Sequence, residues 1–138
     1  MNIKRWTIAS IAVLVVLFVL EFVIHGVLLQ GVYQQTASVW RPMEEMNRLM
    51  WMMWLGYAIA AVFFTLIYAQ GYEKPKAGAA QGARYGLYLG ILLGASMSLG
   101  SYATLPIPGV LALYWFIGAV VEYVAAGAVV GWIYRPEA

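Results

Sequence analysis

Four predominantly apolar stretches, each long enough to cross a bilayer, constrain this chain more than any other feature of its sequence. They cover residues 6–29, 50–69, 84–104 and 110–134, and the first contains an apolar run at 8–20. A membrane-spanning helix needs roughly 20 such residues, so four spans fit within the 138 residues. We therefore expect an all-α integral membrane protein, built as one antiparallel four-helix bundle over residues 1–138.

Composition supports a bilayer as the solvent and excludes several functions. The chain is 64% hydrophobic and 10% charged, whereas soluble domains are about 45–50% apolar and about 25% charged. A net charge of +2 is too weak a bias to favour nucleic-acid binding. The absence of cysteine excludes disulfides, thiolate metal sites and iron–sulfur clusters. The single histidine excludes a bis-histidine haem held by one chain.

Three connections separate the expected spans. They are a polar stretch at 30–49, a Gly/Lys/Pro hinge at 71–83, and a tight turn at 105–109 whose two prolines favour a bend between antiparallel helices. The first span resembles a signal peptide, but Glu21 and His25 stand where a small-residue cleavage site belongs. We therefore expect the first span to remain uncleaved.

Basic residues predict the orientation, because short cytoplasmic segments are enriched in Lys and Arg. The first connection holds only two of them, Arg41 and Arg48. The two termini and the second connection, with its border, hold the other six: Lys4, Arg5, Lys74, Lys76, Arg84 and Arg135. We expect both termini to be cytoplasmic and the protein to be multi-pass.

Glycines recur at every fourth position of the third span. The series comprises Gly78, Gly82, Gly86, Gly90 and Gly94, with Ser98 extending it, and the fourth span adds Gly127 and Gly131. A face without side chains lets another backbone approach closely, which favours helix association in lipid. The pattern favours packing inside the bundle, and the alternative is an interface to a second copy or a larger partner.

Three ionisable residues lie inside the expected spans, where a charge costs at least about 2.5–3.5 kcal/mol and is usually paired or functional. Glu21 and His25 are four residues apart on the first span and share a helix face, and Glu122 lies in the fourth. At 1.5 Å per residue, Glu21 lies roughly 12 Å and Glu122 roughly 20 Å from the outer ends of their spans. The third span offers hydroxyl partners at similar depth: Ser96, Ser98, Ser101 and Tyr102.

This intramembrane polar site, composed of Glu21, His25 and Glu122, has three interpretations. Two carboxyls and an imidazole can relay protons or bind a cation. The same groups suit a transition metal such as zinc, manganese or iron, the one kind of cofactor that these residues could hold. Alternatively, protonated carboxyls hydrogen-bond within the bundle and simply fix the helix register.

A methionine stripe opens the second span. Met43, Met46, Met50 and Met53 fall on one helical face. Thioethers are soft ligands that hold Cu(I), so the stripe is a second candidate metal site. Methionine stripes also serve as adaptable packing, and Glu44 and Glu45 beside them are compatible with a solvated helix start.

Several segments resemble a group of small bacterial four-helix membrane proteins of unknown function. They include HGVLL at 25–29, WRP at 40–42, GYE at 71–73, GARYGL at 82–87, YATLPIP at 102–108 and the segment 122–134. The resemblance covers most of the chain and implies four helices in a bacterial inner membrane. It brings no activity and no catalytic residue.

Small multidrug transporters offer an analogy, because they are similar in size and helix count. They carry one essential first-helix carboxylate that exchanges protons for cationic drugs, and Glu21 matches it in kind. The long polar connection, His25, Glu122 and the charge bias depart from that pattern. The charge bias in particular argues against insertion in both orientations.

Three functional classes therefore stay open. The favoured one is a non-enzymatic membrane subunit or scaffold, docking through its glycine faces as a homo-oligomer or in a larger complex. The second is a small proton- or cation-linked transporter using Glu21, His25 and Glu122. The third is a metal-binding membrane protein or enzyme, the weakest because the sequence has no nucleophile–base pair or phosphate-binding loop.

Overall fold

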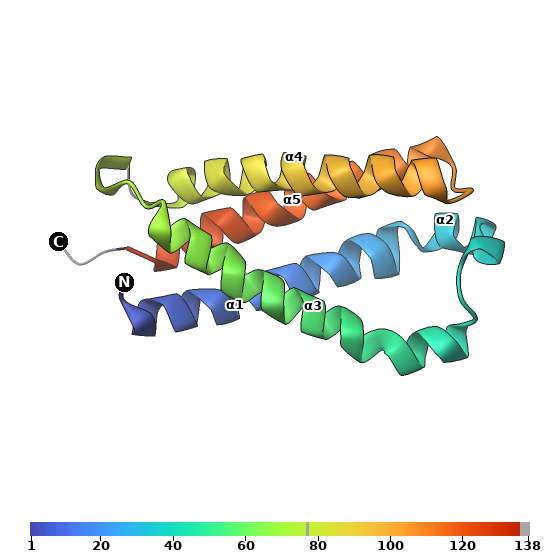
Figure 1. Cartoon of the computed structure of the whole chain (residues 1–138), viewed down its shortest axis with the longest axis horizontal. Coiled ribbons are helices and arrows are strands. Elements are labelled where there is room, and N and C mark those ends of the chain that lie inside the picture. The colour runs from blue at the N-terminus through green and yellow to red at the C-terminus, as the bar shows by residue number, and fades with distance from the viewer. Residues whose placement is uncertain (77, 136–138) are drawn as a thin grey trace.

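The computed structural model describes residues 1–76 and 78–135, and this part of the chain is almost entirely helical (Figure 1). Helix α1 (Ile3–Glu21) continues into the π-helix η1 (Phe22–Leu28), followed by the short α2 (Gln30–Gln35) and the 3-10 turn η2 (Ala37–Val39). The remaining elements are α3 (Met43–Gln70), the 3-10 turn η3 (Lys74–Lys76), α4 (Ala79–Thr104) and α5 (Gly109–Ile133). The described residues contain no strand, which confirms the all-α expectation.

Four helical segments are long and apolar enough to cross a membrane. They comprise Ile3–Leu28, Met43–Gln70, Ala79–Thr104 and Gly109–Ile133, with mean hydropathy between 1.2 and 2.8 over their most apolar windows. Large apolar side chains lie exposed on all four segments, as expected of helices that face lipid. These features indicate a multi-pass membrane protein.

The helix boundaries differ from the expected ones where capping chemistry extends a helix beyond its apolar stretch. The second long helix begins at Met43 rather than at residue 50, because Pro42 precedes its first turn and two acidic residues within that turn favour a helix N-terminus. Likewise α4 begins at Ala79 rather than 84, directly after Gly78, whose φ of 116° is a conformation that glycine adopts readily. The expected polar connection at 30–49 is thus largely helical, as α2, η2 and the start of α3.

Helices α4 and α5 form the most intimate helix pair in the molecule, and the predicted glycines lie between them. An added Cβ at Gly82 would overlap the Gly127 carbonyl, and one at Gly86 would overlap the Tyr123 carbonyl. Nearer the other end of α4, a Cβ at Gly90 would come within 2.9 Å of the Val120 Cα. The six glycines of this interface are all buried: Gly82, Gly86, Gly90, Gly94, Gly127 and Gly131. The two backbones therefore touch directly.

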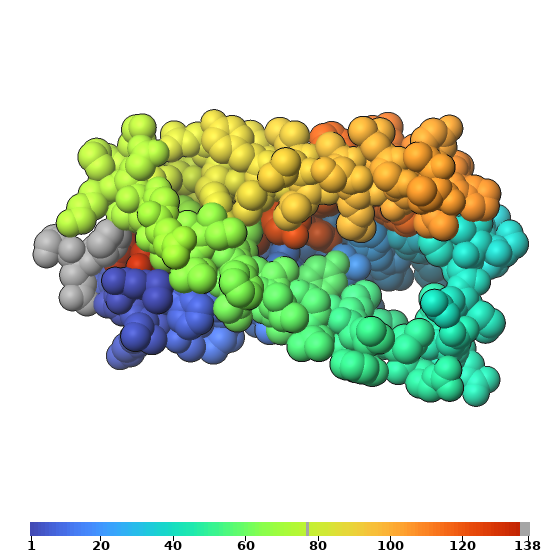
Figure 2. Space-filling view, viewed as in Figure 1, coloured from blue at the N-terminus to red at the C-terminus, as the bar shows by residue number. Residues whose placement is uncertain are grey.

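Helix α1 packs against both α3 and α5, and two separate apolar cores result. The larger core surrounds α1 and includes Ala9, Val13, Leu17, Ala61, Phe64, Ala126 and Val130. The smaller core lies beyond the π-helix and consists of Leu29, Ile107, Leu111 and Ala112. Figure 2 shows that the start of α3 stands apart from the segment that carries α2, with a gap between them.

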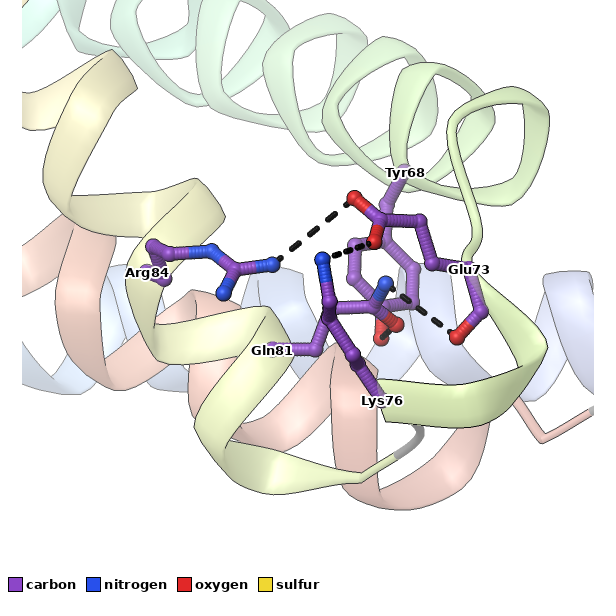
Figure 3. Close-up of polar contacts among 5 residues, drawn as sticks. All are labelled: Tyr68, Glu73, Lys76, Gln81 and Arg84. Atoms are coloured by element: carbon purple, nitrogen blue, oxygen red, sulfur yellow. Dashed lines mark hydrogen bonds and ion pairs between the residues drawn. The ribbon is translucent and has the colours of Figure 1, made fainter.

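Polar contacts fix the connection between α3 and α4 (Figure 3). The Tyr68 hydroxyl donates to Gln81 Oε1 at 3.1 Å, and Gln81 Nε2 donates to the Glu73 carbonyl at 3.4 Å. The Glu73 carboxylate also pairs with Lys76 Nζ at 2.7 Å and with Arg84 at 3.8 Å. The carboxylate of Glu73 thus links the turn η3 to the first turns of α4.

This Glu73 cluster predicts an acid-sensitive connection. The hydrogen bond from Lys76, reinforced by the charges of Lys76 and Arg84, holds the pKa of the Glu73 carboxyl below its ordinary value of 4.5. Because this pKa is lower in the folded state, the stabilisation is complete above pH 4.5 and is lost as pH falls through the folded-state pKa. The thermal midpoint should therefore fall more between pH 6 and pH 3 in the wild type than in Glu73→Gln. Parallel pH profiles of the two proteins would contradict this prediction.

Candidate functional site

The structure brings together the three ionisable residues that the sequence places inside spans. Glu21 ends α1, His25 lies in η1 and Glu122 lies in α5, and one ligand atom from each falls within 4.8 Å of the others. His25 Nε2 lies 3.5 Å from Glu21 Oε2, across one turn of the first span. Two helices that are distant in sequence therefore supply one polar cluster.

Glu122 is the most buried member of this cluster. The residue is 6% exposed, and its Oε1 has no hydrogen-bond partner among the described residues. Glu21 and His25 retain more exposure, at 14% and 26% of their side chains. Leaving a buried acceptor unpaired costs free energy, so this oxygen is poised to accept a hydrogen bond or a ligand that the chain itself does not supply.

The π-helix positions the imidazole. The Leu29 N–H donates to the Ile24 carbonyl at 2.9 Å, a bond that spans five residues in place of the usual four. The segment contains Gly26, a residue of low α-helix propensity. Short π-helical segments occur frequently at functional sites, and His25 lies near the middle of this one.

Tyr33 and Trp115 hold the other side of the imidazole. The Tyr33 hydroxyl lies 2.5 Å from His25 Nδ1, and Trp115 Nε1 donates to the same hydroxyl at 2.7 Å. Burial raises the pKa of Tyr33 to about 12, so its hydroxyl stays protonated at neutral pH. Trp40 supports the arrangement by packing edge-on against Tyr33, with ring centroids 5.6 Å apart. The short helix α2 therefore orients a side chain of the neighbouring span.

A cavity of about 130 Å³ adjoins the cluster. All three ionisable residues line it, and α3, α4 and α5 contribute the rest of its wall, which includes Tyr57, Leu93, Met97, Ser98, Trp115 and Tyr123. The wall mixes hydroxyl groups with apolar side chains, so the cavity can hold water or a small ion beside the carboxyl groups.

Among the other residues singled out in the sequence, Gly94 and Ser98 line the cavity and the rest lie elsewhere. Ser98 lines the cavity, whereas the Ser96 hydroxyl donates to the Leu92 carbonyl of its own helix and Tyr102 is 54% exposed. The cavity wall does not include Ser101. It also includes none of the methionine stripe of α3, namely Met43, Met46, Met50 and Met53. The structure thus keeps the two candidate metal sites apart.

Sequence reasoning missed the aromatic residues around the cluster. Tyr33 falls in the stretch expected to be a polar connection. The other aromatic residues lie at positions that look like ordinary apolar positions of their spans: Tyr57, Trp115 and Tyr123. The one signal available was that Tyr33 follows His25 by two helical turns. That spacing indicates proximity only if the helix continues beyond the first span, which the polar composition argued against.

The fold and the cluster together indicate a multi-pass membrane protein with a polar site enclosed among its helices. Comparisons of the chain with known protein families, with curated protein sequences and with solved structures found no match. The function is therefore argued from the geometry of the site.

Proposed function

We propose that this protein is a small proton- or cation-linked transporter whose exchange site is the Glu21–His25–Glu122 cluster. The observation that carries the proposal is the convergence of one ligand atom from each of the three residues within 4.8 Å. In addition, Oε1 of Glu122 has no hydrogen-bond partner among the described residues. Ionisable groups inside a membrane are costly. Gathering three of them next to a cavity is therefore more readily explained by binding than by packing.

The charges of the site favour a positively charged occupant. In the described part of the chain, the ion pairs of Lys and Arg all involve Glu45 or Glu73, so the two intramembrane carboxyls have only His25 as a charged neighbour. A proton or a cation would supply the missing positive charge. The adjoining cavity would let a cation keep some water while protein ligands replace the rest of its hydration shell.

We also propose that the four spans form an antiparallel bundle in a bacterial inner membrane, with both termini cytoplasmic. The pairing of Gly82 with Gly127, and of Gly94 with Ala119, supports opposite directions for α4 and α5. The Arg5 guanidinium donates to the Arg135 carbonyl, and the Tyr72 and Tyr134 rings lie 6.2 Å apart. These contacts join the start of the first span to the C-terminal segment and the end of α3, which supports gathering most of the basic residues at one end, in agreement with the positive-inside rule.

The glycine face that suggested a scaffold function is buried between α4 and α5 of the same chain. The six glycines expected to dock a partner pack against α4 or α5 within the chain. A partner could reach them only if those two helices separated. A homo-oligomer or a larger complex stays a prediction, but it would have to use other faces of the helices.

Flux measurements on liposomes test the transporter proposal. The purified protein should carry protons or divalent cations down an imposed gradient, read by indicators trapped inside the vesicles. Glu21→Gln keeps the size of the side chain but removes its negative charge, so we expect flux to fall by at least about tenfold while helix content is retained.

The matched control is Glu45→Gln, which changes a carboxylate on α3 that pairs with Arg41 at 2.5 Å outside the cluster. This variant should transport like the wild type. Equal flux through Glu21→Gln and the wild type, or no flux through the wild type under any of these gradients, would refute the proposed function.

A further inference from the structure

We infer that the cation bound by this cluster is a divalent transition-metal ion, and that Tyr33 and Trp115 form an outer shell that presents His25 Nε2 to it. The inference rests on the proposed function and specifies its cargo. Its evidence is the donor set, the geometry of that set, and the hydrogen bonds on the far side of the imidazole.

The donor set selects the class of ion. One imidazole nitrogen and two carboxylate oxygens match the ligands of zinc and of other first-row divalent metals, whereas calcium and magnesium prefer oxygen alone. The 3.5 Å between His25 Nε2 and Glu21 Oε2 also fits. Two ligands about 2.1 Å from a tetrahedral metal lie about 3.4 Å apart, so these two atoms need little movement to bind one ion.

Glu122 supplies the third ligand and independent support. It is 6% exposed, it lines the cavity, and its Oε1 lacks a partner among the described residues. This oxygen would bind a cation without first breaking a hydrogen bond to the protein, so binding costs no protein hydrogen bond at Oε1. With three protein ligands, a tetrahedral ion would keep one open position for water, as exchangeable and catalytic zinc sites do.

The hydrogen bonds beside the imidazole are compatible with the tautomer that binds metal through Nε2. Trp115 Nε1 can only donate, so the Tyr33 oxygen must accept its hydrogen bond. The hydrogen bond between the same hydroxyl and His25 Nδ1, at 2.5 Å, can run in either direction, because a tyrosine hydroxyl both donates and accepts. In the tautomer that carries its proton on Nδ1, Tyr33 accepts from Nδ1–H and the Nε2 lone pair is free to bind a metal. Histidines that bind metals commonly donate their other N–H in this manner.

Metal binding to the full chain in mild detergent tests the inference after treatment with a chelator. We expect the wild type to bind one Zn²⁺ per chain in a calorimetric titration. Co²⁺ should bind at the same site and give the visible absorption of a low-symmetry nitrogen–oxygen environment. His25→Ala and Glu122→Gln should each weaken binding by at least about tenfold.

The outer shell needs its own variant. Tyr33→Phe removes the oxygen that accepts from Nδ1–H but keeps the ring, so it should weaken Zn²⁺ binding by about 10–100-fold and change the Co²⁺ spectrum. Tyr88→Phe removes a hydroxyl from a residue of α4 that is 63% exposed, and should alter neither. Circular dichroism should report unchanged helix content in both variants. An unchanged affinity and spectrum in Tyr33→Phe would refute the outer-shell assignment.

The outcomes separate this inference from the proposed function. If the wild type binds neither Zn²⁺ nor Co²⁺, or if His25→Ala binds them as tightly, the metal assignment is wrong. Proton flux that depends on Glu21 would then still support a transporter. Conversely, stoichiometric binding that requires His25 and Glu122, without any flux, would uphold the metal site and refute transport.

Discussion

Replacing Gly86 with leucine is expected to destroy the packing of α4 on α5. A Cβ at this position would overlap the Tyr123 carbonyl, a backbone group that cannot rotate away as a side chain can. Overpacking a core costs typically about 1–3 kcal/mol, occasionally more, and a whole leucine between touching backbones should exceed that range. The loss should appear as a much lower thermal midpoint and as dissociation of the helices at lower SDS concentration.

Gly100→Leu is the matched control, because it makes the same change on the same helix. A Cβ at Gly100 would meet nothing within 4 Å, so the leucine should face outward and leave stability near that of the wild type. Equal stability of Gly86→Leu and the wild type would contradict the close approach of the two backbones.

Glu122→Met is expected to abolish ion binding and, at the same time, to stabilise the bundle. The substitution removes a buried carboxyl with an unpaired oxygen and fills the space with an apolar chain of similar length. A buried acceptor without a partner costs about 1–3 kcal/mol, and the methionine removes that cost. Thermal unfolding and metal titration of the same preparation would measure the two opposite effects together.

The opposite change in stability would assign Glu122 a structural role. If Glu122 fixes the helix register, removing its carboxyl should lower the unfolding free energy by several kcal/mol. Glu44→Met provides the comparison, because Glu44 is exposed in the first turn of α3 and should shift stability by no more than about 0.5 kcal/mol.

The four helices could be predicted from the sequence because the bilayer imposes a minimum length on an apolar stretch. Apolar length alone did not predict where these helices begin, because it takes no account of the capping residues. Met43–Gln70 begins within a polar segment because Pro42 and two acidic residues start the helix there. The glycine spacing indicated a smooth helix face, but whether another helix of the same chain occupies it depends on tertiary packing.

The candidate site was partly predictable for the same reason. Glu21 and His25 share a face through local helix geometry alone, which the sequence reveals. Their approach to Glu122 depends on how α5 packs against α1, so the sequence supported it only as a hypothesis. Tyr33 reaches His25 through a π-helix and a further short helix, and no spacing rule for a single α-helix describes that path.

The two apolar cores flank the cluster along the length of the bundle. Leu17 of α1 and Ala126 of α5 belong to the larger core on one side of it, and Leu29 and Leu111 belong to the smaller core on the other. Under the proposed function, an ion would reach the cluster only when one of these two cores opens. While one core is open, the other would keep the cluster closed to the opposite side of the membrane. The smaller core contains fewer buried side chains, so we expect it to open at the lower free-energy cost. Under the proposed function, the end of the molecule that carries α2 is therefore the expected entrance.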